Sequence, residues 1–243
     1  MKKNTKKKLL SIMLIIALLA IAVVGGTLAW FTAEDEVTNT FTVGSIKVTQ
    51  NETDSDGNAF IQNQFMLPIV NTITPSADDN YIEKVVTLTN DGKNEAYVRT
   101  HIAYPDALGS YITLDTNTNS PWQFEAHYTV TIDKVDYGVS TFVYTKPLKT
   151  TEPLKTTEPL LYGVYMNANV DVKVNPAKED LGAQFCKYND ISKTYEYSGF
   201  PYTDTVNILV LTQAVQADGF PDWKTALTAA FGAPTDENNP FID

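Results

Sequence analysis

The amino-acid sequence predicts a mainly β protein, an antiparallel β-sandwich or jelly roll with one or two short peripheral helices. Apolar and polar residues alternate with a period of two in several segments rich in Val, Ile, Thr, Tyr and Phe, as expected of half-buried strands. Clusters of Gly, Asn, Asp and Pro separate these segments, which is typical of turns. The single cysteine, Cys186, excludes an intramolecular disulfide, so packing and strand pairing must stabilise the fold.

The alternating segments set the order of the predicted strands. Their number in one chain is typical of a β-sandwich or jelly roll. After the second of them, Asn90-Asp91-Gly92 predicts a hairpin or tight turn, because these residue types tolerate positive φ. In chain order the predicted strands are Phe41–Val43 with Ile46–Val48, Ile82–Leu88, Ala96–Ala103, Trp122–Ile132, Val139–Tyr144, Val164–Val174 and Thr205–Val215.

One helix is predicted over Trp223–Phe231. Its apolar residues recur at i, i+3 and i+4, which gives a helix one apolar face. Pro221-Asp222 is a start signal, and Gly232 with Pro234 is a stop signal. A second short helix is possible around Pro176–Phe185.

The N-terminus has the three regions of a secretory signal peptide. Five lysines form a basic head, an apolar run follows over Leu9–Val24, and small residues lead to Ala29. This pattern predicts a signal peptide over residues 1–29 that is cleaved between Ala29 and Trp30. An uncleaved anchor is the alternative, because counting on to Phe31 makes the segment long enough to span a bilayer. We expect a secreted protein that touches a membrane only through this segment, before cleavage.

The chain that follows the predicted signal peptide is strongly acidic. Residues 1–29 hold five of the 18 Lys and Arg and none of the 29 Asp and Glu, which leaves 13 basic and 29 acidic residues and a net charge of −16. This charge favours solubility, and the lack of a basic patch argues against nucleic-acid binding. The length fits one domain. We place the domain at residues 41–243, after a donor-strand or flexible segment at residues 30–40.

A hexapeptide occurs twice in tandem. Lys149–Leu154 (KTTEPL) is followed directly by the identical Lys155–Leu160. Six residues are too few for a solenoid unit, and the proline in each copy opposes pairing as a central strand. We expect an extended loop over residues 146–160 at a hairpin tip, where doubling a loop costs only about 0.6 kcal/mol. A proline-rich ligand motif is the alternative.

The sequence contains no catalytic signature. It has two histidines and no HExxH motif, no GxSxG motif and no phosphate-binding glycine loop, so no catalytic residue is assigned. A zinc site would have to combine His101, Glu125 and His127, since two histidines and a carboxylate match one catalytic zinc pattern. At i, i+2 on one strand, Glu125 and His127 are expected to share a face. Ordinary, partly buried strand histidines are the alternative.

A calcium site is conceivable at Glu52, Asp54 and Asp56. Carboxylates at alternate positions before Gly57 are similar to the start of a calcium loop, in which oxygens converge around a sharp turn. The first position is Glu rather than Asp, however, and the twelfth is Asn63 rather than the bidentate Glu. A solvated acidic turn is the alternative.

Four blocks of sequence carry a family resemblance. They are Gly25–Thr32 running on to Asn39–Gly44, Lys84–Gly92 leading into Ala96–Arg99, Val170–Val172, and Ala214–Phe220. They span most of the predicted mature chain, and the first is the most specific. Together they resemble the TasA/camelysin family of secreted Gram-positive surface and biofilm-matrix proteins.

The resemblance implies a jelly-roll subunit of extracellular, biofilm-matrix fibres. The implied partners are further copies of the same chain, a SipW-type signal peptidase and sibling matrix proteins. In fibre-forming members, the segment freed by cleavage completes the sheet of the next subunit. Here Trp30, Phe31, Phe41 and Val43 would supply the apolar side chains for such strand addition. A terminus that trails the signal peptide without order is the alternative.

Two other functions stay open. Camelysin-like members imply a cell-surface metallo-endopeptidase, although the sequence lacks a zinc-protease signature. A surface adhesin with the same fold and no polymerisation is the third possibility. Chelator-sensitive proteolysis would identify an endopeptidase. Saturable binding of a ligand that does not depend on the N-terminal segment would identify an adhesin.

Overall fold

The computed structural model describes residues 40, 41, 46–62, 64, 66–70, 80–119, 121–202 and 206–241. All of them belong to one compact unit, Val37–Asp243. The predicted signal peptide and the predicted assembly residues Trp30, Phe31 and Val43 lie outside the described residues. Within the described ranges, no helix has both the length and the apolarity of a membrane span.

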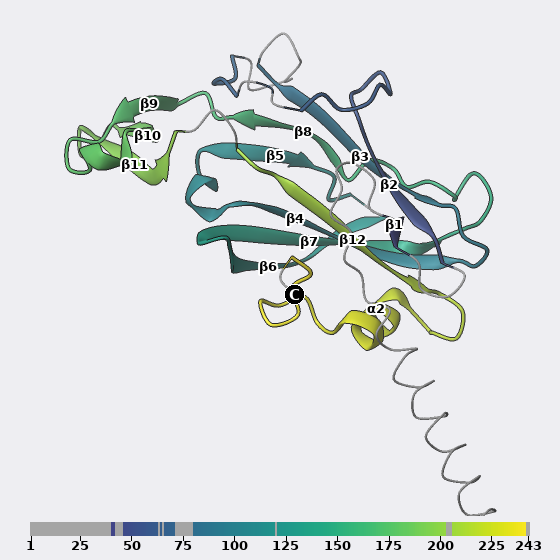
Figure 1. Cartoon of the computed structure of the whole chain (residues 1–243). Coiled ribbons are helices and arrows are strands. Elements are labelled where there is room, and N and C mark those ends of the chain that lie inside the picture. Colours follow the sequence, from purple (N-terminus) through teal and green to yellow (C-terminus); the bar gives the residue numbers. More distant parts are fainter. Residues whose placement is uncertain are drawn as a thin grey trace, which may run out of the picture. The chain divides into compact units, whose positions relative to one another are not determined.

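Two antiparallel sheets pack face to face as a β-sandwich (Figure 1). The predicted class is confirmed, since the described residues are mainly β, with antiparallel sheets and one α-helix, whereas jelly-roll connectivity stays a prediction. The five-stranded sheet has the order β1 (Thr40–Phe41), β2 (Val48–Thr53), β3 (Ile82–Asn90), β8 (Leu161–Met166), β5 (Ile112–Thr116). The four-stranded sheet has the order β12 (Leu209–Gln216), β4 (Ala96–Pro105), β7 (Val135–Leu148), β6 (Trp122–Ile132).

The sandwich core follows from the period-two pattern. Along β3, every second residue from Ile82 to Asn90 is buried, and both sheets send such residues into one cluster. The rings of Trp122 and Tyr144 meet edge-on there, with centroids 5.1 Å apart. Each large apolar side chain that is fully buried contributes about 1.5–3 kcal/mol. The fully buried members include Ile46, Leu88, Ile102, Leu148, Leu160 and Leu161.

A smaller sheet packs at one end of the sandwich. It has the order β11 (Thr194–Pro201), β10 (Ala183–Asn189), β9 (Val170–Val174), and Figure 1 shows it beyond the ends of β8 and β5. Phe185 of β10 is buried against Met166 and against Leu108, which lies in the 3₁₀ turn Asp106–Leu108.

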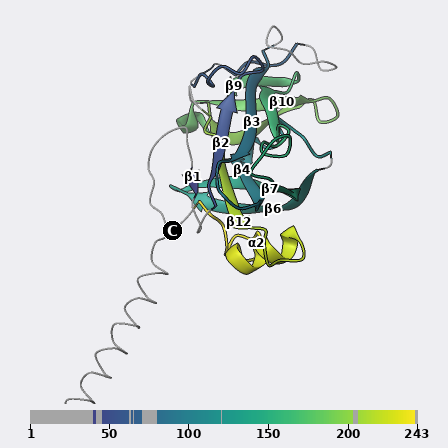
Figure 2. The same ribbon diagram turned by 90° about the vertical axis from the view of Figure 1, so that its right-hand side faces the viewer.

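The outer face of the four-stranded sheet is covered by α2 (Trp223–Phe231) and the segment that follows it. Asp222 caps the helix, because its side chain accepts a hydrogen bond from the Thr225 N–H at 2.7 Å. Leu227 packs against Val143 and Val215. Figure 2 shows α2 on the side of this sheet that faces away from β2 and β3. The predicted helix bounds are confirmed.

Several predicted elements differ from the structure. Phe41 pairs antiparallel with Val48, so these residues belong to two strands rather than to one run. The predicted strand Val164–Val174 is two strands, β8 and β9. The second helix is wrong: only a 3₁₀ turn forms at Glu179–Leu181, and β10 begins at Ala183. The strands β5, β10 and β11 were not predicted.

The turn at Asn90-Asp91-Gly92 is tight but is not a hairpin. It joins β3 to β4, which lie in different sheets. The Gly92 N–H donates to Oδ1 of Asn90 at 2.9 Å, and the buried Asn90 amide donates to the Leu148 carbonyl at 3.0 Å. Asn90 therefore ties the turn to the end of β7.

The hexapeptide tract also crosses between sheets. β7 runs on to Leu148, and the loop over residues 149–160 leads to β8 in the other sheet. The expected hairpin tip is therefore wrong. The second copy is not a free loop either, because Thr156 forms an antiparallel bridge with Thr89 of β3.

Candidate functional site

Two polar side chains are buried on the outer face of β4, under α2 and the C-terminal segment. Arg99 is 1% exposed and His101 is 0% exposed. Their neighbours Val98 and Ile102 point into the sandwich core, so strand alternation sends Arg99 and His101 to the opposite face. The polar atoms of both side chains have specific hydrogen-bond or ion-pair partners.

A β-bulge in β6 decides where the predicted zinc ligands point. Phe124 pairs with Phe142 and Ala126 with Thr141, so Glu125 is an extra residue opposite β7. Such a bulge reverses the alternation of the residues after it. Glu125 reaches the outer face, where it binds Arg99. His127 lies on the inner face, because its partner Ser140 pairs in turn with the core residue Ile102. The predicted shared face of Glu125 and His127 is therefore wrong.

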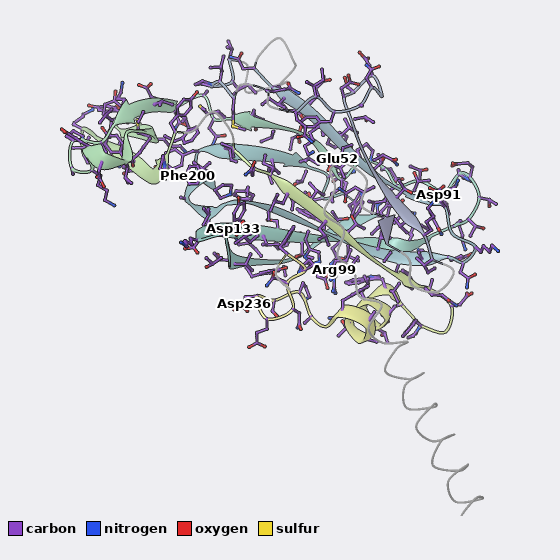
Figure 3. All side chains as sticks on the ribbon, in the orientation of Figure 1. Glu52, Asp91, Arg99, Asp133, Phe200 and Asp236 are labelled. Atoms are coloured by element: carbon purple, nitrogen blue, oxygen red, sulfur yellow. The ribbon has the colours of Figure 1, made fainter. Side chains whose placement is uncertain are left out.

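The Arg99 guanidinium forms a bidentate ion pair with Glu125. Nε and one terminal nitrogen of Arg99 each donate to a carboxylate oxygen at 2.8 Å. The other terminal nitrogen donates to the Gly232 carbonyl at 3.0 Å. One side chain, Arg99 (labelled in Figure 3), thus joins β4, β6 and the end of α2. This geometry uses both carboxylate oxygens of Glu125.

His101 is held by three hydrogen-bond partners. Nε2 lies 3.1 Å from Oε1 of Gln213, and Nδ1 lies 3.1 Å from the Tyr128 hydroxyl and 3.0 Å from the Thr141 hydroxyl. A neutral ring fits this set, with Nε2–H donating to Gln213 and Nδ1 accepting from a hydroxyl. Burial, which the hydrogen bond to Gln213 opposes and the nearby charge of Arg99 reinforces, lowers the pKa of His101 to about 4.

The edge of the Phe241 ring packs against His101, with centroids 6.4 Å apart. Phe241 also joins the cluster around Tyr137 and Val139 on the outer face. The C-terminal segment therefore closes the outer face over His101.

The three predicted zinc ligands do not converge. His101 and Glu125 lie on the outer face, each bound to other residues, whereas His127 bonds Ser140 across the inner face at 3.1 Å. Within the described ranges, no three His, Cys, Asp or Glu side chains are grouped so that they could hold one metal ion.

The predicted calcium ligands serve as turn and ion-pair residues. Glu52 forms an ion pair with Lys84 (Figure 3 labels Glu52 on β2). Asp54 accepts from the Asn58 side chain at 2.9 Å and from the backbone N–H groups of Asn58 and Asp56 at 2.8 and 3.0 Å. These hydrogen bonds, that of the Asn58 side chain first, lower the pKa of Asp54. Asp56 is exposed.

The outer edge of β2 is the candidate assembly edge. β1 pairs with it through Thr40–Thr49 and Phe41–Val48. At the other end, the Phe60 N–H donates to the Glu52 carbonyl at 3.2 Å, and Thr53 bridges Ala59. Between these contacts, Gln50 and Asn51 pair with β3 on one side and face no strand on the other, among the described residues.

Behind this edge, a series of hydrogen-bonded polar side chains links the two sheets inside the sandwich. The Gln50 amide donates to the Val210 carbonyl at 3.3 Å, and the Thr212 hydroxyl donates to Oε1 of Gln50 at 2.9 Å. The hydroxyls of Thr212 and Thr100 are 3.0 Å apart. These contacts join β2 to β12, the edge strand of the other sheet. These side chains join the two sheets, and among the described residues no strand pairs with the outer backbone edge of β2 at Gln50 and Asn51.

Sequence reasoning missed Arg99 and Gln50. Arg99 lies between Val98 and Thr100, and Gln50 lies between Thr49 and Asn51; neither set of neighbours indicates that the polar side chain between them is buried. A signal did exist for Arg99. It is the only arginine in the chain, and guanidinium is the cation best suited to a buried bidentate pair.

Comparison with protein-family models, curated proteins and solved structures finds no match to this chain.

Proposed function

We propose that the mature chain is a secreted structural protein, a subunit of extracellular or biofilm-matrix fibres that assemble by donation of the N-terminal strand. The observation that carries this proposal is the edge of the five-stranded sheet, where the described residues of β1 pair with Val48 and Thr49 of β2 and no other described strand pairs with this edge. The sequence resemblance to the TasA/camelysin family points in the same direction.

The register of β1 indicates where a donated strand would lie. Thr40 pairs with Thr49 and Phe41 with Val48. If a donated strand continued the same register toward its N-terminus, its Asn39 would lie opposite Gln50 and its Thr38 opposite Asn51. These are the positions of β2 that lack an outer neighbour among the described residues. An exposed strand edge is a template for pairing with another chain.

The small size of β1 makes exchange feasible. Its described part is two residues long, so it forms few ladder hydrogen bonds there, and each contributes only about 0.5–1.5 kcal/mol net. The same segment of a neighbouring copy would offer identical pairs together with the apolar anchors Trp30 and Phe31. Replacing one by the other therefore loses little within a subunit and gains contacts between subunits.

The endopeptidase interpretation gains no support from the site geometry. It requires His101 and His127 to share a metal, yet they lie on opposite faces of the four-stranded sheet. The adhesin interpretation has no specific observation in its favour among the described residues. Secretion and cleavage by a SipW-type peptidase remain part of the proposal, and a neighbouring peptidase gene with sibling matrix genes would support it.

Electron microscopy of the mature chain, residues 30–243, tests the proposal. We expect filaments from this chain and none from a chain that starts at Thr42, which lacks β1 and the segment before it. Equal melting temperatures of the two would show that the truncated chain still folds. A synthetic peptide of residues 30–43 should stop filament growth. Monodisperse particles from the mature chain under all conditions would refute the proposal.

A further inference from the structure

The two copies of the hexapeptide have the same sequence but different surroundings. In the first copy, Thr151 is exposed and Leu154 is 37% exposed. In the second copy, the equivalent Thr157 is buried and Leu160 is 0% exposed. Because the residues are identical, position in the fold and not chemistry sets this difference.

The second copy is docked against β3 and the core. The Thr157 N–H donates to the Leu88 carbonyl at 2.9 Å, and the Leu88 N–H donates to the Thr157 hydroxyl at 3.0 Å. The Trp122 indole donates to the Glu158 carbonyl at 2.9 Å, and the Tyr144 hydroxyl donates to the Glu158 carboxylate. Burial, followed by this carboxylate, raises the pKa of Tyr144.

The ends of the first copy meet. The Lys149 N–H donates to the Leu154 carbonyl at 2.8 Å. This bond brings the peptide group that follows Leu148 next to the one that precedes Lys155. Leu148 could therefore be joined to Lys155 with a small local shift. The first copy, Lys149–Leu154, is thus a loop whose two ends meet, and we call this loop the excursion.

The excursion cannot move to the other end of the docked copy. Leu160 and Leu161 are both 0% exposed. The Leu160 N–H donates to the Val86 carbonyl at 2.8 Å, and its own carbonyl accepts from the Asn117 N–H at 2.7 Å. Extra residues inserted after Leu160 would break these bonds and open the core, so surplus residues must emerge between Leu148 and Lys155.

We infer that the tract is an expandable surface loop: the last copy of the hexapeptide docks on β3, and every copy before it is added to the exposed excursion without a change in the fold. Each copy contributes one lysine and one glutamate, so expansion leaves the net charge unchanged. Each also contributes a proline, which keeps the longer loop from becoming a free strand edge. Copy number then changes what the protein presents to its surroundings while the sandwich stays the same.

Mature chains with one, two and three copies test the inference. Deleting either copy yields the same one-copy sequence. We expect the remaining copy to pack on β3 as Lys155–Leu160 does. The three melting temperatures should agree within about 3 °C, since loop closure depends weakly on length. A larger drop for the one-copy or the three-copy chain would overturn the inference.

Matched substitutions show which copy is docked. Thr157→Val removes the acceptor of the buried Leu88 N–H and should lower the melting temperature by roughly 5 °C, whereas Thr151→Val should leave it unchanged. Equal effects of the two substitutions would mean that the copies exchange places, which would also overturn the inference. Both outcomes are independent of filament formation.

Discussion

His101 shows how burial turns an ordinary residue into a pH-dependent one. Its ring is enclosed by β6, β7, β12 and Phe241, and burial lowers its pKa to about 4. In the unfolded chain the pKa of histidine is about 6.5. Between these values the unfolded chain binds a proton that the folded protein does not bind, so folding stability falls as the pH falls.

We predict that His101 removes about 3 kcal/mol of stability as the pH drops from 6.5 to 4. Carboxylates titrate over part of the same range, so the comparison must be made with a variant. Urea unfolding of His101→Gln should show a flatter pH dependence than the parent chain. His127→Gln is the control, because His127 is exposed. Parallel pH curves for the parent chain and His101→Gln would contradict the prediction.

Gly163 is required by a close approach within the five-stranded sheet. A Cβ atom at this position would lie 2.4 Å from Cζ of Tyr81 and 2.5 Å from the Ile82 carbonyl oxygen. The Tyr81 ring cannot move freely, because its hydroxyl donates to Asp115 at 2.9 Å. The carbonyl belongs to the neighbouring strand β3.

Gly163→Ala should therefore destabilise the protein by about 1–3 kcal/mol or more, as overpacking does. Gly138→Ala is the matched control within the other sheet. Its Cβ would meet only side-chain ends, Oδ1 of Asp106 at 3.0 Å and Cε1 of His127 at 3.2 Å, which can shift. Chemical denaturation of both variants measures the difference, and an equal loss from both would show that the contact with Tyr81 is not the cause.

At the scale of elements, one side chain joins the helix to the sheet. Arg99 of β4 binds Glu125 of β6 and the carbonyl of Gly232 at the end of α2. Breaking a buried pair leaves an uncompensated charge, and this typically costs about 3–5 kcal/mol.

We predict that Arg99→Met has an effect of that size, measured by urea unfolding. The double variant Arg99→Met/Glu125→Leu should recover much of the loss, because it removes both charges. Arg99→Lys should not recover it, since an ammonium cannot form the bidentate pair. A double variant that is as unstable as Arg99→Met would indicate that packing, rather than charge, dominates at this site.

Elements defined by local signals were predictable from the sequence. The helix Trp223–Phe231 has its cap and stop residues next to it in the chain, and both of its bounds were correct. The strand Trp122–Ile132 was also placed correctly. The Glu125 bulge within it was not predicted, because a bulge depends on the register with β7 rather than on local alternation.

Features set by distant contacts could not be read from the pattern. The turn at Asn90 has the residue types typical of a hairpin turn. It nevertheless connects two sheets, since the partners of β3 are β2 and β8. In the two KTTEPL copies, too, distant contacts and not local sequence set the burial, because residues that are buried in one copy are exposed in the other. For Glu125 and His127, the residue types were visible in the sequence, but the faces of the sheet on which they lie were not.

At the scale of the whole described unit, the sandwich has edges of different character. In the four-stranded sheet, the edge strand β12 is joined to β2 by the Gln50 and Thr212 side chains. In the five-stranded sheet, the outer edge beyond Thr49 carries no strand at Gln50 and Asn51 among the described residues. A fibre built by strand donation would use this second edge, and the first would keep each subunit closed.

Disulfide trapping tests the proposed donation most directly. Asn51 would face Thr38 in the continued register of β1, and the only native cysteine, Cys186, is buried. A mixture of mature chains carrying Thr38→Cys with chains carrying Asn51→Cys should form mixed disulfide dimers within filaments. If the bridge forms only within one chain that carries both substitutions, and never between chains, strand donation between subunits is contradicted.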